Sequence, residues 1–224
     1  MPEYLKANRL AVENIKDKPV LSGCIGPFSL AGRLYDMSEI MVGIYIEPDV
    51  VKTLLDKCTA YITAYCRELK VIGATGVIMA EPAAGLLSNE DCQEYSTVYV
   101  RQIVEAVQDE NFAVILHNCG NKGQCTQAMI DSGAAALHFG NAVNMVETLE
   151  QCPSDLIVMG NIDPVGILKQ ATSEEVYRIT ADLLSKTSQY KNFVISSGCD
   201  MPPLVPDANI KAFYQAIADF NTGK

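Results

Sequence analysis

The chain has 224 residues, of which 49% are hydrophobic and 20% are charged, a composition typical of a compact globular protein. Its 27 acidic and 17 basic side chains give a net charge of −10 without any basic run, which argues against binding to nucleic acid. It contains no apolar segment of the roughly 18 residues that a membrane span needs and no signal-peptide pattern, so we expect no membrane partner and a cytoplasmic location.

Six short, β-branched apolar segments alternate along the chain with helical patterns. The predicted strands are residues 18–26, 74–82, 112–120, 134–141, 156–163 and 193–200. Residues 47–72 repeat apolar side chains every three to four positions, and residues 172–184 and 206–220 begin with helix-start signals. Continuous apolar strands separated by helices are typical of a parallel sheet that is buried on both faces.

Two architectures fit this alternation, an open doubly wound sheet and a (β/α) barrel. No G-x-G-x-x-G motif follows the first strand, which removes the simplest case for a dinucleotide-binding sheet. The pattern therefore favours an α/β fold of the TIM-type (β/α)-barrel class, in a single domain over residues 1–224. The barrel would be incomplete, because about six strand–helix units are present where a closed barrel has eight.

Residues with metal-binding or acid–base chemistry stand at the predicted strand ends, where both architectures bind ligands. They are Cys24, Glu81, His117, Cys119, His138, Asn141, Asn161, Asp163, Cys199 and Asp200. His117 and Cys119 occupy positions i and i+2, so their side chains can point to the same side and bind one ion. Cys199 is placed to be a third ligand, and three protein ligands leave the open position of a catalytic zinc site.

Structural interpretations of the same residues stay open. A cysteine at a strand end is usually a small buried apolar residue, and a histidine there usually has a hydrogen-bond partner in the core or rim. The eight cysteines include no C-x-x-C pair, the spacing that a structural zinc site would more often show. In a reducing cytoplasm we expect most of them to be free thiols.

Four segments together resemble the uroporphyrinogen decarboxylase superfamily, and within it the zinc-dependent methylcobamide:coenzyme M methyltransferase branch. They are GATGVIMAEPAAG, LHNCGN, VMGNIDPVGIL and SSGCDMPPLVPDANIKAF, in the order and spacing of that branch. The resemblance implies a TIM-type barrel with zinc at its C-terminal mouth, and His117, Cys119 and Cys199 as ligands. Decarboxylation of a porphyrinogen is disfavoured, because the decarboxylase branch usually has a histidine in place of Cys199 and lacks the H-x-C pair.

The resemblance also implies a reaction. A thiol in the open position of zinc would lose its proton and attack the methyl group of methylcobalamin on a separate corrinoid protein. In the other direction the site would act on a methylated substrate. The cofactors are therefore zinc and a partner's cobalamin, and the partners are a corrinoid protein and a small thiol or methylated substrate.

Further residues at the strand ends are candidates for catalysis and substrate binding. Glu81 is a candidate fourth ligand or proton acceptor, and Asp163 a candidate partner for the second nitrogen of His117. Alternatively, Glu81 is a helix-start carboxylate and Asp163 an N-cap before a proline. Asn161, His138 and Asn141 are candidate substrate-binding residues.

The chain departs from the family pattern in two places. Relatives usually carry an acidic residue where this chain has Gly140 and Asn141; His138 would partly replace it, unless it is a core histidine bonded to a backbone carbonyl. Relatives also have an additional N-terminal third that forms the first barrel strands. An open barrel edge exposes unpaired backbone groups, so we predict a homodimer.

Two other functions stay open: a barrel remnant that binds a corrinoid or methyltransferase partner without turnover, and a uroporphyrinogen decarboxylase-like lyase.

Overall fold

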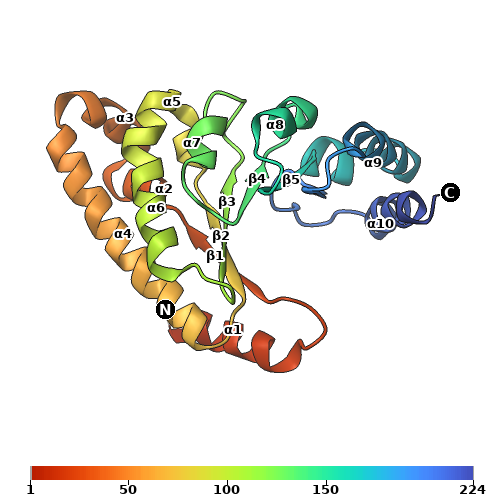
Figure 1. Cartoon of the computed structure of the whole chain (residues 1–224), viewed down its shortest axis with the longest axis horizontal. Coiled ribbons are helices and arrows are strands. Elements are labelled where there is room, and N and C mark those ends of the chain that lie inside the picture. Colours follow the sequence, from red (N-terminus) through yellow and green to blue (C-terminus); the bar gives the residue numbers. More distant parts are fainter. Residues whose placement is uncertain (1, 224) are drawn as a thin grey trace. The chain divides into compact units, whose positions relative to one another are not determined.

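The computed structural model describes residues 2–223, which alternate between strands and helices (Figure 1). The strands follow one another in the sheet in the order β1-β2-β3-β4-β5-β6. A doubly wound sheet would reverse this order at a switch point, so the sequential order confirms the predicted (β/α)-barrel class. Contacts divide the chain into two compact units, unit 1 up to Leu137 and unit 2 from His138 on. The predicted single domain stays a prediction.

The two units contain the following elements, with the boundary between them inside β4. Unit 1 contains α1 (Pro2–Asn14), β1 (Leu21–Ile25), α2 (Pro27–Tyr35), α3 (Met37–Ile46), α4 (Pro48–Val71), β2 (Gly76–Ala80), η1 (Pro82–Leu86), α5 (Asn89–Cys92), η2 (Gln93–Thr97), α6 (Val98–Val107), β3 (Ala113–Asn118) and α7 (Thr126–Ile130). Strand β4 (Ala136–Phe139) leads into unit 2, with α8 (Met145–Gln151), β5 (Ile157–Ile162), η3 (Pro164–Lys169), α9 (Ser173–Thr187), β6 (Phe193–Ser197) and α10 (Asp207–Thr222).

The predicted elements are present. Each of the six predicted strands contains an observed strand, and the three predicted helices correspond to α4, α9 and α10. Helix α9 begins with a capping box: the Thr172 hydroxyl accepts a hydrogen bond from the Glu175 N–H (3.3 Å), and the Glu175 carboxylate accepts one from the Thr172 N–H (2.9 Å). This pair satisfies two backbone donors at the helix start, as the sequence predicts.

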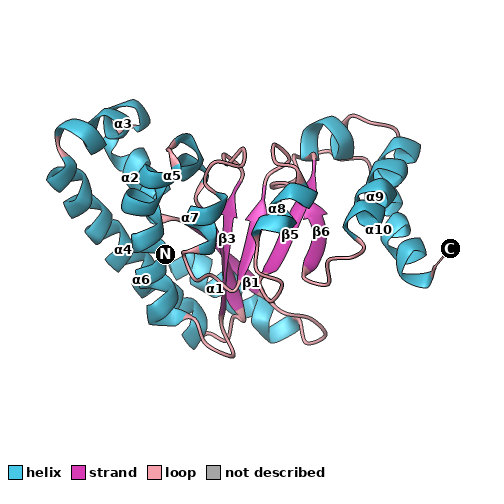
Figure 2. Cartoon of the chain, turned by 45° about the horizontal axis from the view of Figure 1, so that its top comes forward, coloured by secondary structure: helices cyan, strands magenta, loops and turns pink. Residues whose placement is uncertain are grey.

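In unit 1, strands β1, β2 and β3 pair in parallel, and the register brings Ile25, Ala80 and His117 to the same level. Helices α4 and α6 lie side by side next to these strands (Figure 1, Figure 2). Helix α4 buries Leu55 and residues three or four positions before and after it, which form its apolar stripe. The parallel pairing of β1, β2 and β3 places their carboxyl ends at one edge of the sheet, where ligands bind in such folds.

In unit 2, strand β5 pairs in parallel with β6, and helices α9 and α10 pack side by side (Figure 2). A small core of Ile162, Leu168 and Val176 holds these elements together, with Ile195 and Phe213 packed against it. Among the described residues, no helix is long and apolar enough to cross a membrane.

Candidate metal centre

Strand β3 carries the H-x-C pair to the edge of unit 1. His117 is the last residue but one of the strand, and Cys119 follows directly after its end. His117 is buried, with 6% of its surface exposed, and Cys119 is half-buried. Side chains two positions apart along a strand point to the same side. The local structure therefore provides the geometry that the sequence predicts for this pair.

Two buried asparagines on either side of Cys119 shape the loop after β3. The side-chain oxygen of Asn118 accepts hydrogen bonds from the N–H groups of Gly120 (3.1 Å) and Asn121 (3.0 Å). That of Asn121 accepts from the N–H groups of Gly123 (2.8 Å) and Cys125 (3.0 Å). Such bonds are typical of Asx turns. Sequence reasoning missed both residues, although an asparagine on each side of Cys-Gly is a turn signal.

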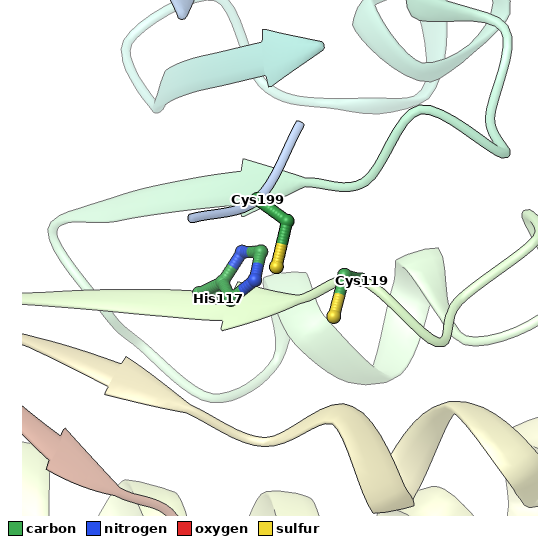
Figure 3. Close-up of side chains that lie close together, drawn as sticks. All are labelled: His117, Cys119 and Cys199. Atoms are coloured by element: carbon green, nitrogen blue, oxygen red, sulfur yellow. The ribbon is translucent and has the colours of Figure 1, made fainter. Parts of the chain in front are cut away.

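The three predicted zinc ligands form the candidate metal group of the structure. Their ligand atoms, from His117, Cys119 and Cys199, lie within 4.8 Å of one another (Figure 3). Zinc bonds of about 2.0–2.3 Å place tetrahedral ligand atoms about 3.5 Å apart, a separation within the 4.8 Å limit of this group. One imidazole and two thiols are also ligands that zinc prefers. The donor set therefore fits zinc.

Glu81, the residue after β2, has its carboxylate directed to the start of helix α2. It is 1% exposed and accepts hydrogen bonds from the N–H groups of Phe28 (2.7 Å) and Ser29 (2.8 Å) and from the hydroxyl of Ser96 (3.1 Å). Burial raises the pKa of the Glu81 carboxyl, while these hydrogen bonds act in the opposite direction. The carboxylate is thus a helix-start group, but of α2 rather than of the helix that follows it in the chain.

Asp163 caps the helix that begins directly after it. Its Oδ1 accepts hydrogen bonds from the N–H groups of Val165 (2.8 Å) and Gly166 (2.9 Å). These contacts agree with the N-cap interpretation of an aspartate before Pro164. Its role as a partner of His117 stays a prediction.

Asn161 holds the turn that follows β4. Its side-chain N–H₂ donates to the carbonyls of Gly140 (2.9 Å) and Val143 (2.8 Å). Asn141, Asn161 and Asp163 line the same open cavity of about 700 Å³, which lies within unit 2. The structure thus brings these three predicted residues together, and their roles toward a substrate stay predictions.

His138 bonds the end of strand β6. Its Nε2 lies 2.8 Å from the carbonyl oxygen of Ser197 and 2.9 Å from the hydroxyl of Ser196. Because a carbonyl only accepts hydrogen bonds, Nε2 carries the hydrogen in the contact with Ser197. This is the backbone-carbonyl contact that the alternative interpretation of His138 expects. Burial lowers the pKa of its imidazole from the ordinary value of 6.5.

We expect His138 to make the stability of the protein depend on pH. Since folding lowers its pKa, the unfolded chain binds the proton at a higher pH than the folded chain does. The contribution of neutral His138 to the free energy of unfolding is complete above pH 6.5, and it is lost as the pH falls from there toward the folded-state pKa. The free energy of unfolding, from urea denaturation at about pH 7.5 and about pH 5.5, should therefore fall less in His138→Gln than in the wild type. An equal fall in both proteins would contradict this.

Comparison with known proteins places the chain in a family. The uroporphyrinogen decarboxylase (URO-D) family profile matches residues 1–220, so the chain belongs to the URO-D family. It is 27% identical over 219 residues to the methylcobamide:CoM methyltransferase MtbA of Methanosarcina mazei, covering 96% of this chain and 63% of that protein. It is 24% identical over 223 residues to the uroporphyrinogen decarboxylase of Legionella pneumophila, covering 96% and 62%.

A solved structure shares the fold. A methyltransferase from Methanosarcina mazei matches 98% of this chain and 64% of its own, with a TM-score of 0.88 and 22% sequence identity. This likeness agrees with the barrel class drawn from the strand order. The chain spans less than two thirds of the length of these similar proteins.

Proposed function

We propose that this chain is a zinc-dependent methyltransferase that moves a methyl group between a corrinoid protein and a thiol or related acceptor. The observation that carries the proposal is the group of one imidazole and two thiols at His117, Cys119 and Cys199, with ligand atoms within 4.8 Å of one another. The similarity to a methylcobamide:CoM methyltransferase supplies the substrate classes. We favour uroporphyrinogen decarboxylase activity less, because the imidazole and the two thiols of this group have no evident role in a decarboxylation.

The chain's own residues would prepare the site for a thiol. His117 and Cys119 would supply a nitrogen and a sulfur from one strand end, and Cys199 a second sulfur. Both cysteines must lose their protons to bind metal, and two thiolates with a neutral imidazole balance the charge of a divalent ion. When bound, zinc would act as a Lewis acid that lowers the pKa of a thiol in the fourth position. A site of net charge near zero would leave that sulfur nucleophilic.

The methyl donor in this proposal is a methylcobamide on a separate corrinoid protein, so cobalamin is the partner's cofactor. The MtbA relative is named for the same pair of substrates, methylcobamide and CoM. The reverse direction, starting from a methylated substrate, uses the same residues. The predicted homodimer and cytoplasmic location stay predictions.

A methyl-transfer assay with free methylcobalamin and coenzyme M as the thiol tests this function. We expect the zinc-loaded wild type to consume methylcobalamin and to form the methyl thioether. Cys199→Ala should lose this activity, whereas a variant of a buried cysteine that is not part of the group, Cys58→Ala, should retain it. A wild type that binds zinc without turnover would favour the remnant. Consumption of uroporphyrinogen instead would favour the decarboxylase.

A further inference from the structure

Two hydrogen bonds that involve Glu81 and Ser29 connect the start of helix α2 to the residues directly after β2. The Glu81 carboxylate accepts the N–H of Ser29, and the Ser29 hydroxyl accepts the N–H of Ala83 in η1 (3.1 Å). Gly26, directly before α2, makes room for this contact, because a Cβ at that position would lie 2.5 Å from Oε2 of Glu81. The buried carboxylate thereby fixes where η1 begins.

Helix η1 in turn lies directly against the loop that carries Cys119. A Cβ on Gly85 would lie 2.2 Å from the carbonyl carbon of Gly120, and one on Gly120 would lie 2.3 Å from the carbonyl oxygen of Pro82. The side-chain N–H₂ of Gln124 donates to the carbonyl of Gly85 (2.7 Å). The two segments therefore pack backbone against backbone, and a shift of η1 must move the loop.

The backbone of Glu81 also contacts a candidate zinc ligand. Its N–H donates to the carbonyl oxygen of His117 (2.8 Å), which continues the parallel pairing of β2 with β3 beyond Ala80. Glu81 thus bonds α2 through its side chain and β3 through its main chain. It links the start of helix α2 to the strand end that bears His117.

We propose that Glu81 is a positioning residue, whose carboxylate holds η1 against the loop after β3 and so fixes the direction of Cys119. This inference rests on the proposed zinc site, and it replaces the roles of fourth ligand and proton acceptor that the sequence suggests. The hydrogen bonds from the N–H groups of Phe28 and Ser29 require the two acceptor oxygens of a carboxylate. A glutamine has one acceptor oxygen, so its amide N–H₂ would face the N–H of Phe28 or of Ser29.

The test compares Glu81→Gln with Glu90→Gln, an exposed glutamate on α5, in the full chain. In the metal-free protein, amide hydrogen exchange of residues 118–126 should rise about tenfold or more in Glu81→Gln. The dissociation constant for zinc should also rise about tenfold or more, as for other partners that orient metal ligands. The visible absorption bands of the cobalt(II)-substituted protein should shift, and Glu90→Gln should leave all three measurements unchanged.

A second variant keeps the test decisive if Glu81→Gln does not fold. Gly26→Ala crowds the carboxylate without removing it, and we expect the same three changes with smaller size. Unchanged exchange in residues 118–126, or a rise spread evenly over all elements, would overturn the inference. Weakened zinc binding with unchanged exchange would indicate direct ligation by Glu81 and would overturn it as well.

Zinc binding by the wild type and hydrogen exchange in the loop after β3 are two separate measurements. A wild type that binds no zinc would remove the proposed function. The hydrogen-exchange comparison uses metal-free protein, so it would still decide whether Glu81 holds the loop.

Discussion

Cys119→Ala is expected to weaken zinc binding by about 5 kcal/mol, roughly half of the binding free energy of a small structural zinc site. The substitution removes one of two thiolates and leaves one imidazole and one thiolate, a set too small to hold the ion tightly. Competition with a chromophoric chelator at fixed pH measures the change. His117→Ala and Cys199→Ala should have effects of similar size.

Cys125→Ala is the matched control for this prediction. Cys125 lies in the same loop and is fully buried, but its thiol donates to backbone carbonyls such as that of Leu87 (3.4 Å). We expect the variant to bind zinc as the wild type does. If Cys125→Ala lost the metal and Cys119→Ala kept it, the ligand assignment would be wrong.

Gly85→Ala is expected to lower the free energy of unfolding by about 3 kcal/mol. The added Cβ would lie 2.2 Å from the carbonyl carbon of Gly120 and 2.4 Å from the nitrogen of Asn121. Both are backbone atoms, so no side-chain rotation relieves the overlap, and η1 must move away from the loop after β3. Urea denaturation followed by circular dichroism measures the loss.

Gly23→Ala provides the comparison for Gly85→Ala. A Cβ on Gly23, in strand β1, would meet no atom within 4 Å. We therefore expect this variant to be about as stable as the wild type. Equal stability of the two variants would show that the close packing of η1 on the loop after β3 is not needed.

Local sequence patterns predict the elements of this protein well, because each depends on neighbouring residues. The apolar run before His117 predicts β3, and Thr172 with Glu175 predicts the start of α9. The i, i+2 spacing of His117 and Cys119 likewise predicts a shared direction from the strand alone.

Contacts between residues far apart in the chain could not be predicted in this way. Glu81 bonds Phe28, 53 positions earlier, and His138 bonds Ser196, 58 positions later. Both partners depend on which strands become neighbours and on their register, and neither quantity is encoded in a local pattern. The sequence therefore located Glu81 at a strand end but not the helix that its carboxylate serves.

We propose that one histidine and two cysteines of this chain hold zinc and leave a fourth position open. Zinc-edge X-ray absorption on the wild-type protein measures these ligands. We expect two sulfur neighbours at about 2.3 Å, with nitrogen or oxygen neighbours at about 2.0–2.1 Å. A zinc-loaded protein without sulfur neighbours, or a protein that takes up no zinc on reconstitution, would rule out this ligand set.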